Sequence, residues 1–403
     1  MIVPYNSQSK AMKNSKSYLK ILLATVILTA CQKKATEPIV TLKSSSLDLK
    51  ALSAKVMERI NLQPGEKVFM VGQPNEFDSL IVLLGDQISK SGGVYMGTIN
   101  VDTVSWPSSW NNDFVKSTNG KTKEELTKLF DSLAIDIGIM LPGPTPANVP
   151  YAAWQDVLRK GKGRAVHFHW AGANSLTGSP IPIDSTISKI YQKVILETDY
   201  TALTKIQSEF ENAIRKETVT ITTPKSSLTF KIGDRPVTKQ DGDISKARSE
   251  VARNLIDREV ELPAGAIRVA PLEETIEGTI EFPNAMWGDQ RVEGLVVTFK
   301  KGKITDVKAT QGLDFVKSKL DAGKEGYLFR ELGVGFNPLL AVTNDNQRIL
   351  HYGYGAGIVR LSFGNNAELG GVVGGDFVRI NLFTDATVTV GKDVWIKDGK
   401  LMK

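Results

Sequence analysis

The stretch KVFMVGQPNEFDSLIVLLGDQISKSGGVYMGTI, from Lys67 to Ile99, decides the fold class. Its first five residues are an apolar run typical of a buried strand. Apolar residues spaced three or four apart over 77–84 then predict an amphipathic helix, with Asn75 as its cap. The glycine pair at 92–93 ends the helix, and VYMGTI at 94–99 predicts a second strand. A strand, a helix and a strand in this order predict two parallel strands joined by a crossover helix.

The same alternation continues along the chain. TKEE at 122–125 fits a capping box at the start of a helix, and strands are expected at 135–141 and 164–170 with a helix at 151–159 between them. A long helix over 192–215 is expected to close this part of the chain. Strands that alternate with helices predict an α/β domain with an open, mostly parallel sheet.

The pattern changes after residue 216. Short β patterns separated by Gly-, Asn- and Asp-bearing turns dominate, and helical patterns are confined to 245–258 and 313–319. We therefore predict an α/β N-terminal domain over 51–216 and a β-rich α+β C-terminal domain over 217–403.

The N-terminus predicts export and lipidation. Lysines precede ILLATVILTA at 21–30, an apolar segment too short to span a bilayer as a helix, so it is typical of a secretory signal. It ends in LTAC, which resembles the bacterial lipobox, and Cys31 is the single cysteine of the chain. We predict a lipoprotein signal peptide over 1–31, lipidation of Cys31 and a flexible tether over 32–50. The alternative is an ordinary signal peptide followed by an accidental cysteine.

Charge and location follow from the same segment. The formal net charge is +6, but four lysines and no acid lie before residue 31, so the rest carries 46 basic against 44 acidic residues. That balance, and the lack of a basic run interleaved with aromatics, argues against a nucleic-acid partner. The expected partner is the membrane, through the lipid anchor. The expected location is the bacterial cell envelope, at the outer membrane or facing the periplasm.

Five fragments carry a family resemblance, and they occur in the family's order from residue 51 onwards. They are LSAKVMERINLQPGEKVFMVG at 52–72, LPAGAIRVAPLEETIEGTIEF at 262–282, FRELGVGFNP at 329–338, GIVRLSFGNN at 357–366 and VVGGDFVRI at 372–380. Together they resemble the aminopeptidase T and aminopeptidase S family of thermophilic metalloproteases. The resemblance implies an α/β domain, a β-rich domain with a two-metal site, removal of N-terminal residues from peptides, and dimers of this chain.

The resemblance also implies where the metal ligands would lie, and most are replaced. The family's first glutamate ligand falls on Ala266, and its first histidine falls on Arg360. The second glutamate is retained as Glu331. Alanine and arginine offer no lone pair to a metal ion.

The last fragment shows the same loss. The family's second histidine falls on Gly374, whereas the aspartate two residues later is retained as Asp376. The tyrosine thought to assist catalysis falls on Ala367. Only Glu331 and Asp376 therefore remain of five ligand positions, so metal binding is doubtful and we name no catalytic residue.

Arg360 is the most informative replacement. A guanidinium is always charged, repels a metal ion and can pair with the two retained carboxylates. We expect Arg360 to take the place of the lost ions beside Glu331 and Asp376. If that pair is buried, Arg360→Ala should destabilise the protein by about 3–5 kcal/mol.

The sequence gives little indication that any of the three histidines replaces a lost metal ligand. His351 is expected as a partly exposed loop residue that could in principle reach the site. His167 and His169 would share one face of a strand and form a transition-metal pair, but no third ligand is near in sequence. We expect them to be polar decoration at a strand end.

Four functions remain open. The first is a lipid-anchored, catalytically degenerate protein that binds a peptide, ligand or partner in the inherited cleft, without a cofactor. The second is an active aminopeptidase with zinc, cobalt or manganese, held by Glu331, Asp376 and groups such as His351 or Glu368. The third is a structural envelope lipoprotein, and the fourth is iron-dependent ring-cleaving oxygenation, known among relatives of the family.

Overall fold

A computed structural model describes residues 47–73, 77–102 and 110–403. The signal peptide, Cys31, most of the tether and the expected cap Asn75 lie outside these ranges. The helix expected after Asn75 runs from Asp78 to Lys90, and Phe77 occupies its N-cap position.

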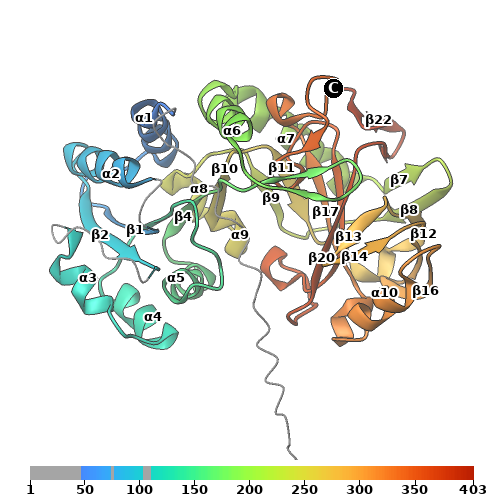
Figure 1. The fold of residues 1–403 in the computed structure, drawn as a ribbon, viewed down its shortest axis with the longest axis horizontal. Helices are drawn as coiled ribbons and strands as arrows, with labels where there is room; N and C mark the ends of the chain where they lie inside the picture. Colours follow the sequence, from blue (N-terminus) through green and yellow to red (C-terminus); the bar gives the residue numbers. More distant parts are fainter. Residues whose placement is uncertain (1–46, 74–76, 103–109) are drawn as a thin grey trace, which may run out of the picture. The chain divides into compact units, whose positions relative to one another are not determined.

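The N-terminal part contains a five-stranded sheet in which every pair of neighbours is parallel. The strand order is β10-β4-β3-β1-β2 (Figure 1). This confirms the α/β fold class. The strands are β1 (Lys67–Gly72), β2 (Val94–Asn100), β3 (Ile137–Met140), β4 (Arg164–Phe168) and β10 (Glu259–Leu262).

Helices cover both faces of this sheet because alternate residues of β1 point to opposite sides. Val68 and Met70 pack in one buried cluster with α1 and α2, while Phe69 and Val71 pack in another with α4 and α5 (Figure 1). A capping box at Thr122 and Glu125 begins α4, as predicted. The helices are α1 (Leu49–Ile60), α2 (Asp78–Lys90), α3 (Asp113–Thr118), α4 (Lys123–Ser132) and α5 (Val149–Arg159).

Two expected helices are each split in two. The helix predicted over 192–215 is α6 (Ser185–Glu197) followed by α7 (Tyr200–Lys216), because Asp199 accepts a hydrogen bond from the Ala202 amide and starts a new helix. The helix predicted over 245–258 is α8 (Lys246–Glu250) and α9 (Leu255–Arg258), with Asn254 as the second N-cap. Short polar side chains bond neighbouring backbone amides and favour helix starts over helix interiors.

The C-terminal part is β-rich, as predicted, and the neighbouring strands of its two large sheets are antiparallel. One sheet has the order β20-β19-β17-β11-β9, and a second has the order β16-β15-β12-β8-β7-β21-β22-β23. The first comprises β9 (Val237–Gln240), β11 (Ala266–Val269), β17 (Phe329–Gly335), β19 (Val359–Gly364) and β20 (Val378–Phe383). The second comprises β7 (Val219–Thr223), β8 (Ser226–Phe230), β12 (Glu277–Glu281), β15 (Val296–Lys300), β16 (Lys303–Lys308), β21 (Thr387–Val390), β22 (Asp393–Lys397) and β23 (Lys400–Leu401).

Smaller elements connect these sheets. The strand pair β13 (Ala285–Trp287) and β14 (Gln290–Val292) forms a hairpin, and α10 covers Leu313–Leu320. A three-stranded sheet joins β18 (Arg348–Ile349) to β5 (Ala173–Ser175) and β6 (Pro180–Ile181). It therefore pairs a segment of the β-rich part with one that follows β4.

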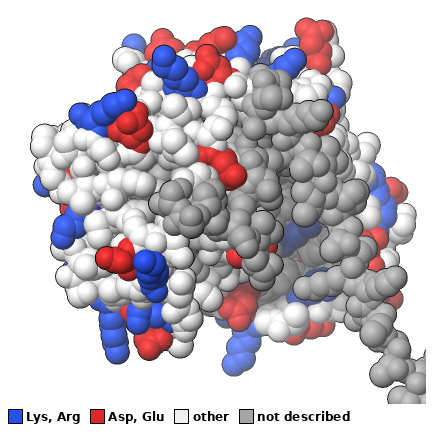
Figure 2. Space-filling view, turned by 60° about the vertical axis from the view of Figure 1, so that its left-hand side comes forward, with Lys and Arg blue, Asp and Glu red and all other residues white. Residues whose placement is uncertain are grey.

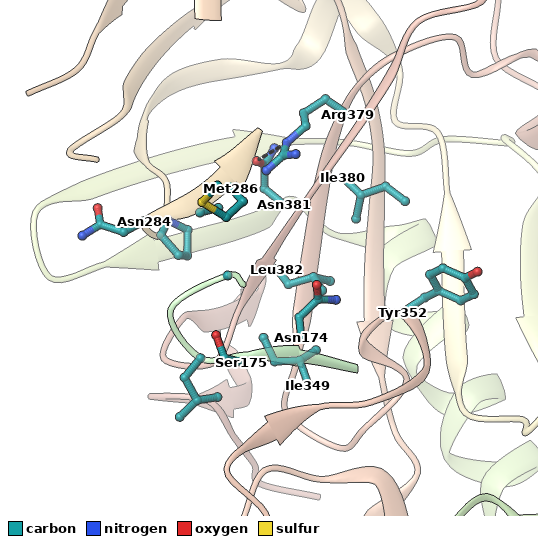
Figure 3. A pocket seen from close by; sticks show the side chains of 14 residues that line it. Asn174, Ser175, Asn284, Met286, Ile349, Tyr352, Arg379, Ile380, Asn381 and Leu382 are labelled. Carbon is teal, nitrogen blue, oxygen red and sulfur yellow. Dashed lines mark hydrogen bonds between the residues drawn. The ribbon is translucent and has the colours of Figure 1, made fainter. Parts of the chain in front are cut away.

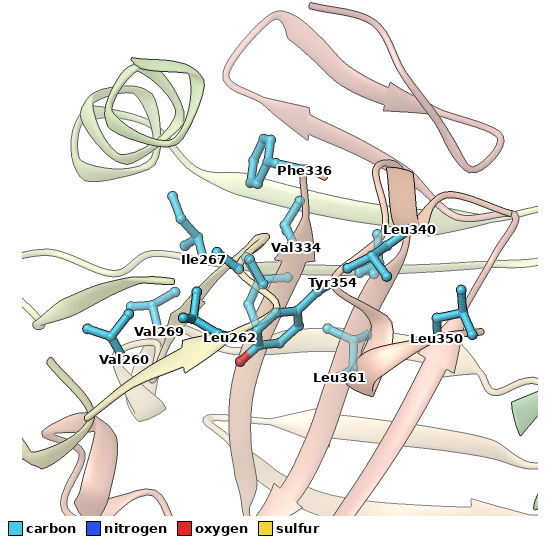
Figure 4. Packing of buried hydrophobic residues seen from close by; sticks show 14 of the residues in the cluster. Val260, Leu262, Ile267, Val269, Val334, Phe336, Leu340, Leu350, Tyr354 and Leu361 are labelled. Atoms are coloured by element: carbon cyan, nitrogen blue, oxygen red, sulfur yellow. The ribbon is translucent and has the colours of Figure 1, made fainter. Parts of the chain in front are cut away.

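The core is continuous across the expected boundary at residue 216. Val260 and Leu262 of β10 belong to the same buried cluster as Ile267, Val334 and Leu361 of the β-rich sheet (Figure 4). The separate domains 51–216 and 217–403 stay a prediction, but the α/β sheet takes its fifth strand, β10, from beyond that boundary. None of the helices within the described residues has both the length and the apolar character of a membrane span.

Candidate functional site

The sheet with the order β20-β19-β17-β11-β9 carries three of the family ligand positions on neighbouring strands: Ala266 on β11, Glu331 on β17 and Arg360 on β19. Arg268 of β11 lies opposite Gly333 of β17, and Gly333 lies opposite Arg360 of β19. A Cβ at residue 333 would lie only 3.0 Å from Nε of Arg360. The missing side chain of Gly333 therefore lets Arg360 lie across the sheet toward its neighbours.

Glu331 is the centre of the site and is fully buried. Its Oε1 lies 2.8 Å from Nε of Arg360 and accepts a hydrogen bond from the Ser362 hydroxyl at 3.3 Å. Its Oε2 accepts a hydrogen bond from Nη2 of Arg268 at 3.0 Å and lies 3.6 Å from Nε of Arg330. Both carboxylate oxygens are thus occupied by protein groups.

Electrostatics keep this carboxylate ionised. Burial alone would raise the pKa of Glu331, but the charges of Arg268, Arg360 and Arg330 outweigh it and lower the pKa to about 2. Burial likewise opposes the charge of Arg268, and the nearby carboxylates reverse that effect and raise its pKa.

Glu368 completes a group that we call the arginine cluster: Arg268, Arg330 and Arg360 with Glu331 and Glu368. Oε1 of Glu368 lies 3.1 Å from Nη2 of Arg268 and also accepts a hydrogen bond from Arg330. The cluster thus holds three cations and two anions. Although Arg360 is close to Glu331, its Nε and Nη2 make no hydrogen bond of good geometry with the described residues.

A metal ion does not fit this arrangement. Both oxygens of Glu331 already contact arginine or serine, and three guanidinium groups would repel a divalent cation. Ala266 lies on β11, is buried and carries no ligand atom. Within the described residues, no group of three His, Cys, Asp or Glu side chains is placed to hold a metal ion.

The other family positions lie away from the cluster. Asp376 is exposed, and its backbone amide donates to Oε1 of Glu325 at 2.9 Å. No hydrogen bond or ion pair joins the carboxylate of Asp376 to Glu331 or Arg360 among the described residues. Gly374 is exposed, with no atom within 4 Å of the position a Cβ would take. The structure therefore brings Glu331 and Arg360 together but leaves Asp376 outside.

A cavity of about 490 Å³ borders the arginine cluster. Ala367 and Glu368, in a 3-10 helix at Ala367–Leu369, line one side, and Arg258 of α9 lines another. Arg258 donates to the Gly163 carbonyl at 3.1 Å and forms no ion pair with an acid of the described chain. The full lining is Leu158, Arg159, Gly161, Ala252, Arg253, Asn254, Leu255, Arg258, Asn365, Ala367, Glu368 and Gly370.

All three histidines lie in one group, in which His167 and His351 are buried and His169 is half-buried, whereas sequence reasoning had placed them apart. The ring centroids of His167 and His169 are 3.6 Å apart, and those of His169 and His351 are 5.5 Å apart. His351 is only 1% exposed, so the expectation of a partly exposed loop residue was wrong. It is buried because its 3-10 turn packs against Tyr191 and Tyr354.

Two glutamates of β10 complete this histidine cluster. Oε1 of Glu261 lies 3.7 Å from Nε2 of His169, and its Oε2 lies 3.9 Å from Nε2 of His351. Burial would raise the pKa of Glu261, but the hydrogen bond and charge of His169 lower it well below its usual value. Burial raises the pKa of Glu259 to about 7, although Tyr151 donates to it at 2.6 Å. Burial also lowers the pKa of His351 to about 3.

Arg268, Arg330 and the histidine cluster were not identified as site residues from the sequence. Arg268 had a usable signal, since it lies two residues after Ala266 and must share its face of the strand. Arg330 adjoins Glu331, so a regular strand would place its side chain on the other face. The register of β17 shifts between Phe329 and Glu331, and Nε of Arg330 lies 3.6 Å from Oε2 of Glu331. The histidine cluster depends on the pairing of β10 with β4, which no local pattern encodes.

On the face drawn in Figure 2, basic and acidic side chains of the described residues are interspersed, not gathered in a patch of one sign. Several basic residues pair with acids, for example Lys160 and Lys162 with Asp131.

Comparisons with known proteins bear on the family and the fold. The family model for thermophilic metalloprotease (M29) matches residues 203–334. Comparison with curated sequences found no match. The fold is similar to that of a 2,5-dihydroxypyridine dioxygenase from Pseudomonas putida KT2440, with a TM-score of 0.59 and 13% identity over 88% of this chain and 96% of the dioxygenase. It is also similar to that of wild-type AmpT from Thermus thermophilus, with a TM-score of 0.55 and 14% identity over 88% of this chain and 99% of AmpT.

At such low identity, the similarity to these two structures shows the fold alone. The match to the family model includes Ala266 and Glu331. Residues 203–334 are thus similar to the thermophilic metalloprotease family, and the fold is similar to that of AmpT, which confirms the resemblance read from the sequence.

Proposed function

We propose that this protein is a catalytically degenerate relative of the metalloproteases, anchored to the cell envelope through Cys31, that binds a peptide or small ligand in the inherited cleft. The observation that carries the proposal is the arginine cluster. Arg268 and Arg360 lie 3.0 and 2.8 Å from Glu331, where a metal centre would need unoccupied lone pairs.

The cavity beside Glu368 supports ligand binding. Its volume of about 490 Å³ lies in the range of small-molecule and peptide pockets. Arg258 lines it and has no ion pair with an acid among the described residues, whereas Arg159 pairs with Asp156 and Arg253 with Asp234. We therefore expect the ligand to carry a negative group toward Arg258.

Metal content and activity test the degenerate site. Protein incubated with zinc, cobalt or manganese and then desalted should retain substantially less than one ion per chain, and it should not release p-nitroaniline from leucine p-nitroanilide. Glu331→Gln should change neither result, and Glu274→Gln, an exposed carboxylate, serves as the matched control. One or more ions per chain together with p-nitroaniline release, both lost in Glu331→Gln, would establish the alternative of an active aminopeptidase.

The cavity and the anchor need separate measurements. Fluorescence anisotropy with labelled acidic hexapeptides should show binding that weakens about tenfold in Arg258→Gln and is unchanged in Arg348→Gln. Binding that Arg258→Gln leaves intact would contradict the assignment of this cavity. Incorporation of labelled palmitate that is lost in Cys31→Ser would support the anchor, whereas labelling retained in Cys31→Ser would refute it.

A further inference from the structure

A second cavity, separate from the arginine cluster, contains an arginine without a counterion. The cavity has a volume of about 180 Å³ and lies between β20, the β13–β14 hairpin and β5 (Figure 3). This is about the volume of six waters in the liquid, so it admits only a small ligand or one end of a larger one. Arg379 of β20 lines it.

Arg379 is held in place by neutral groups. Its Nε donates to Oδ1 of Asn381 at 3.2 Å, and its guanidinium lies 4.4 Å from the centre of the Trp287 ring. Asn381 is itself fixed, because it is 4% exposed and donates to the Leu361 carbonyl. These contacts use one edge and one face of the guanidinium.

The two terminal nitrogens of Arg379 have no hydrogen-bond or ion-pair partner among the described residues. Burial lowers the pKa of this arginine to about 10, and no acid of the described chain offsets that effect. The contrast with the arginine cluster is clear, because there every guanidinium lies within 4 Å of a carboxylate. A partly buried cation without a partner destabilises a protein unless an anion offsets it.

The rest of the lining defines the ligand further. Apolar side chains of Met286, Ile349 and Leu382 face the cavity, together with the amide of Asn174 (Figure 3). No lysine and no second arginine line it, whereas phosphate sites commonly gather several cations. A single planar guanidinium beside an apolar wall matches a carboxylate with a short hydrocarbon body.

We propose that this cavity binds the carboxylate of a small apolar acid or of a peptide C-terminus, with Arg379 as the recognition residue. The two sources share their chemistry, and the size of the cavity favours a short aliphatic body. This site is independent of the cavity beside Glu368, so either assignment can fail without the other.

The test uses 4-methylpentanoate and its amide, which have the same shape and differ in charge. Titrated into the full chain in a neutral detergent, the acid should bind at least tenfold more tightly than the amide. Added salt should weaken the binding of the acid and leave the binding of the amide unchanged. The amide also controls for partition into detergent. Equal binding of acid and amide, or binding of neither, would overturn the proposal.

Variants locate the site. Arg379→Gln should weaken acid binding at least tenfold, whereas Arg291→Gln, a change at a nearby arginine that pairs with Glu293 at 3.1 Å, should have no effect. Because Arg379→Gln also removes the contact with Trp287, Ile380→Phe provides a second route that narrows the cavity and keeps the guanidinium. Unchanged acid binding in Ile380→Phe and Arg379→Gln would place the acid elsewhere and refute the assignment. A parallel titration with N-acetylglycylleucine distinguishes the two sources of the carboxylate. Tighter binding of N-acetylglycylleucine than of 4-methylpentanoate would indicate a peptide C-terminus, and the reverse would indicate a free acid.

Discussion

Replacement of Glu331 by glutamine tests the electrostatic argument most directly. The change keeps the shape of the side chain but removes the carboxylate that Arg268, Arg330 and Arg360 share, and among the described residues Glu368 then remains as the ion-pair partner of Arg268 and Arg330. A folded pKa of about 2 against an ordinary value of 4.5 corresponds to about 3 kcal/mol at pH 7, at about 1.4 kcal/mol per pH unit. Since Glu331 is fully buried, solvent screening does not reduce this figure.

The pH dependence gives the prediction its sign. Because folding lowers the pKa of Glu331, its contribution to stability is complete above about pH 4.5 and is lost as the pH falls toward 2. The difference between wild type and Glu331→Gln should therefore be about 3 kcal/mol at pH 7 and smaller by about 2 kcal/mol at pH 3.

Urea unfolding followed by tryptophan fluorescence measures this difference, and urea is preferred because guanidinium salts would screen the charges. Glu274→Gln is the matched control and should change the free energy of unfolding by less than about 0.5 kcal/mol. A cost below 1 kcal/mol for Glu331→Gln at pH 7, or a cost that does not change with pH, would refute the reasoning.

Three further predictions use the same unfolding measurement. Arg360→Ala should lower the free energy of unfolding by about 1–3 kcal/mol, because Arg268 still contacts Glu331 at 3.0 Å. This is less than the loss of about 3–5 kcal/mol expected for an isolated buried pair. A loss above about 5 kcal/mol would mean that Arg268 does not compensate for the missing guanidinium. Asp199→Ala should cost about 0.5–2 kcal/mol through loss of the α7 N-cap, and no loss would contradict the split helix. Burial raises the pKa of Glu259 to about 7, so its contribution is complete below pH 4.5 and lost as the pH rises through 7; Glu259→Gln should therefore flatten the stability profile between pH 5 and 8, and an unchanged profile would exclude Glu259 as its source.

Local sequence patterns predicted individual helices and strands well where the spacing of apolar residues and the capping residues indicate the same element. The strand at Lys67–Gly72 and the capping box at Thr122 follow from residues within a few positions of each other. The helix over 192–215 failed because Asp199 competes for a backbone amide inside a run that keeps its apolar period. Periodicity alone does not reveal such a break.

Part of the candidate site could also be predicted from the sequence. The pairing of Glu331 with Arg360 follows from the family positions, because adjacent strands bring them together. The exposure of Asp376 does not follow, since its place depends on the loop that carries Gly374 and on the bond from its amide to Glu325. The histidine cluster brings together residues of β4, of β10 and of the turn at His351, which are far apart in the sequence and which the tertiary fold unites.

The strand β10 has a consequence for how this chain can be divided. The polypeptide leaves the α/β sheet after β4, returns at Glu259 to lie beside that strand, and leaves the sheet again at Leu262. A fragment truncated at residue 216 would expose the unpaired edge of β4 and lack both carboxylates that neighbour His167 and His169. The α/β sheet is therefore complete only with a strand from beyond residue 216, and a division of the chain at that residue would separate β10 from its partner β4.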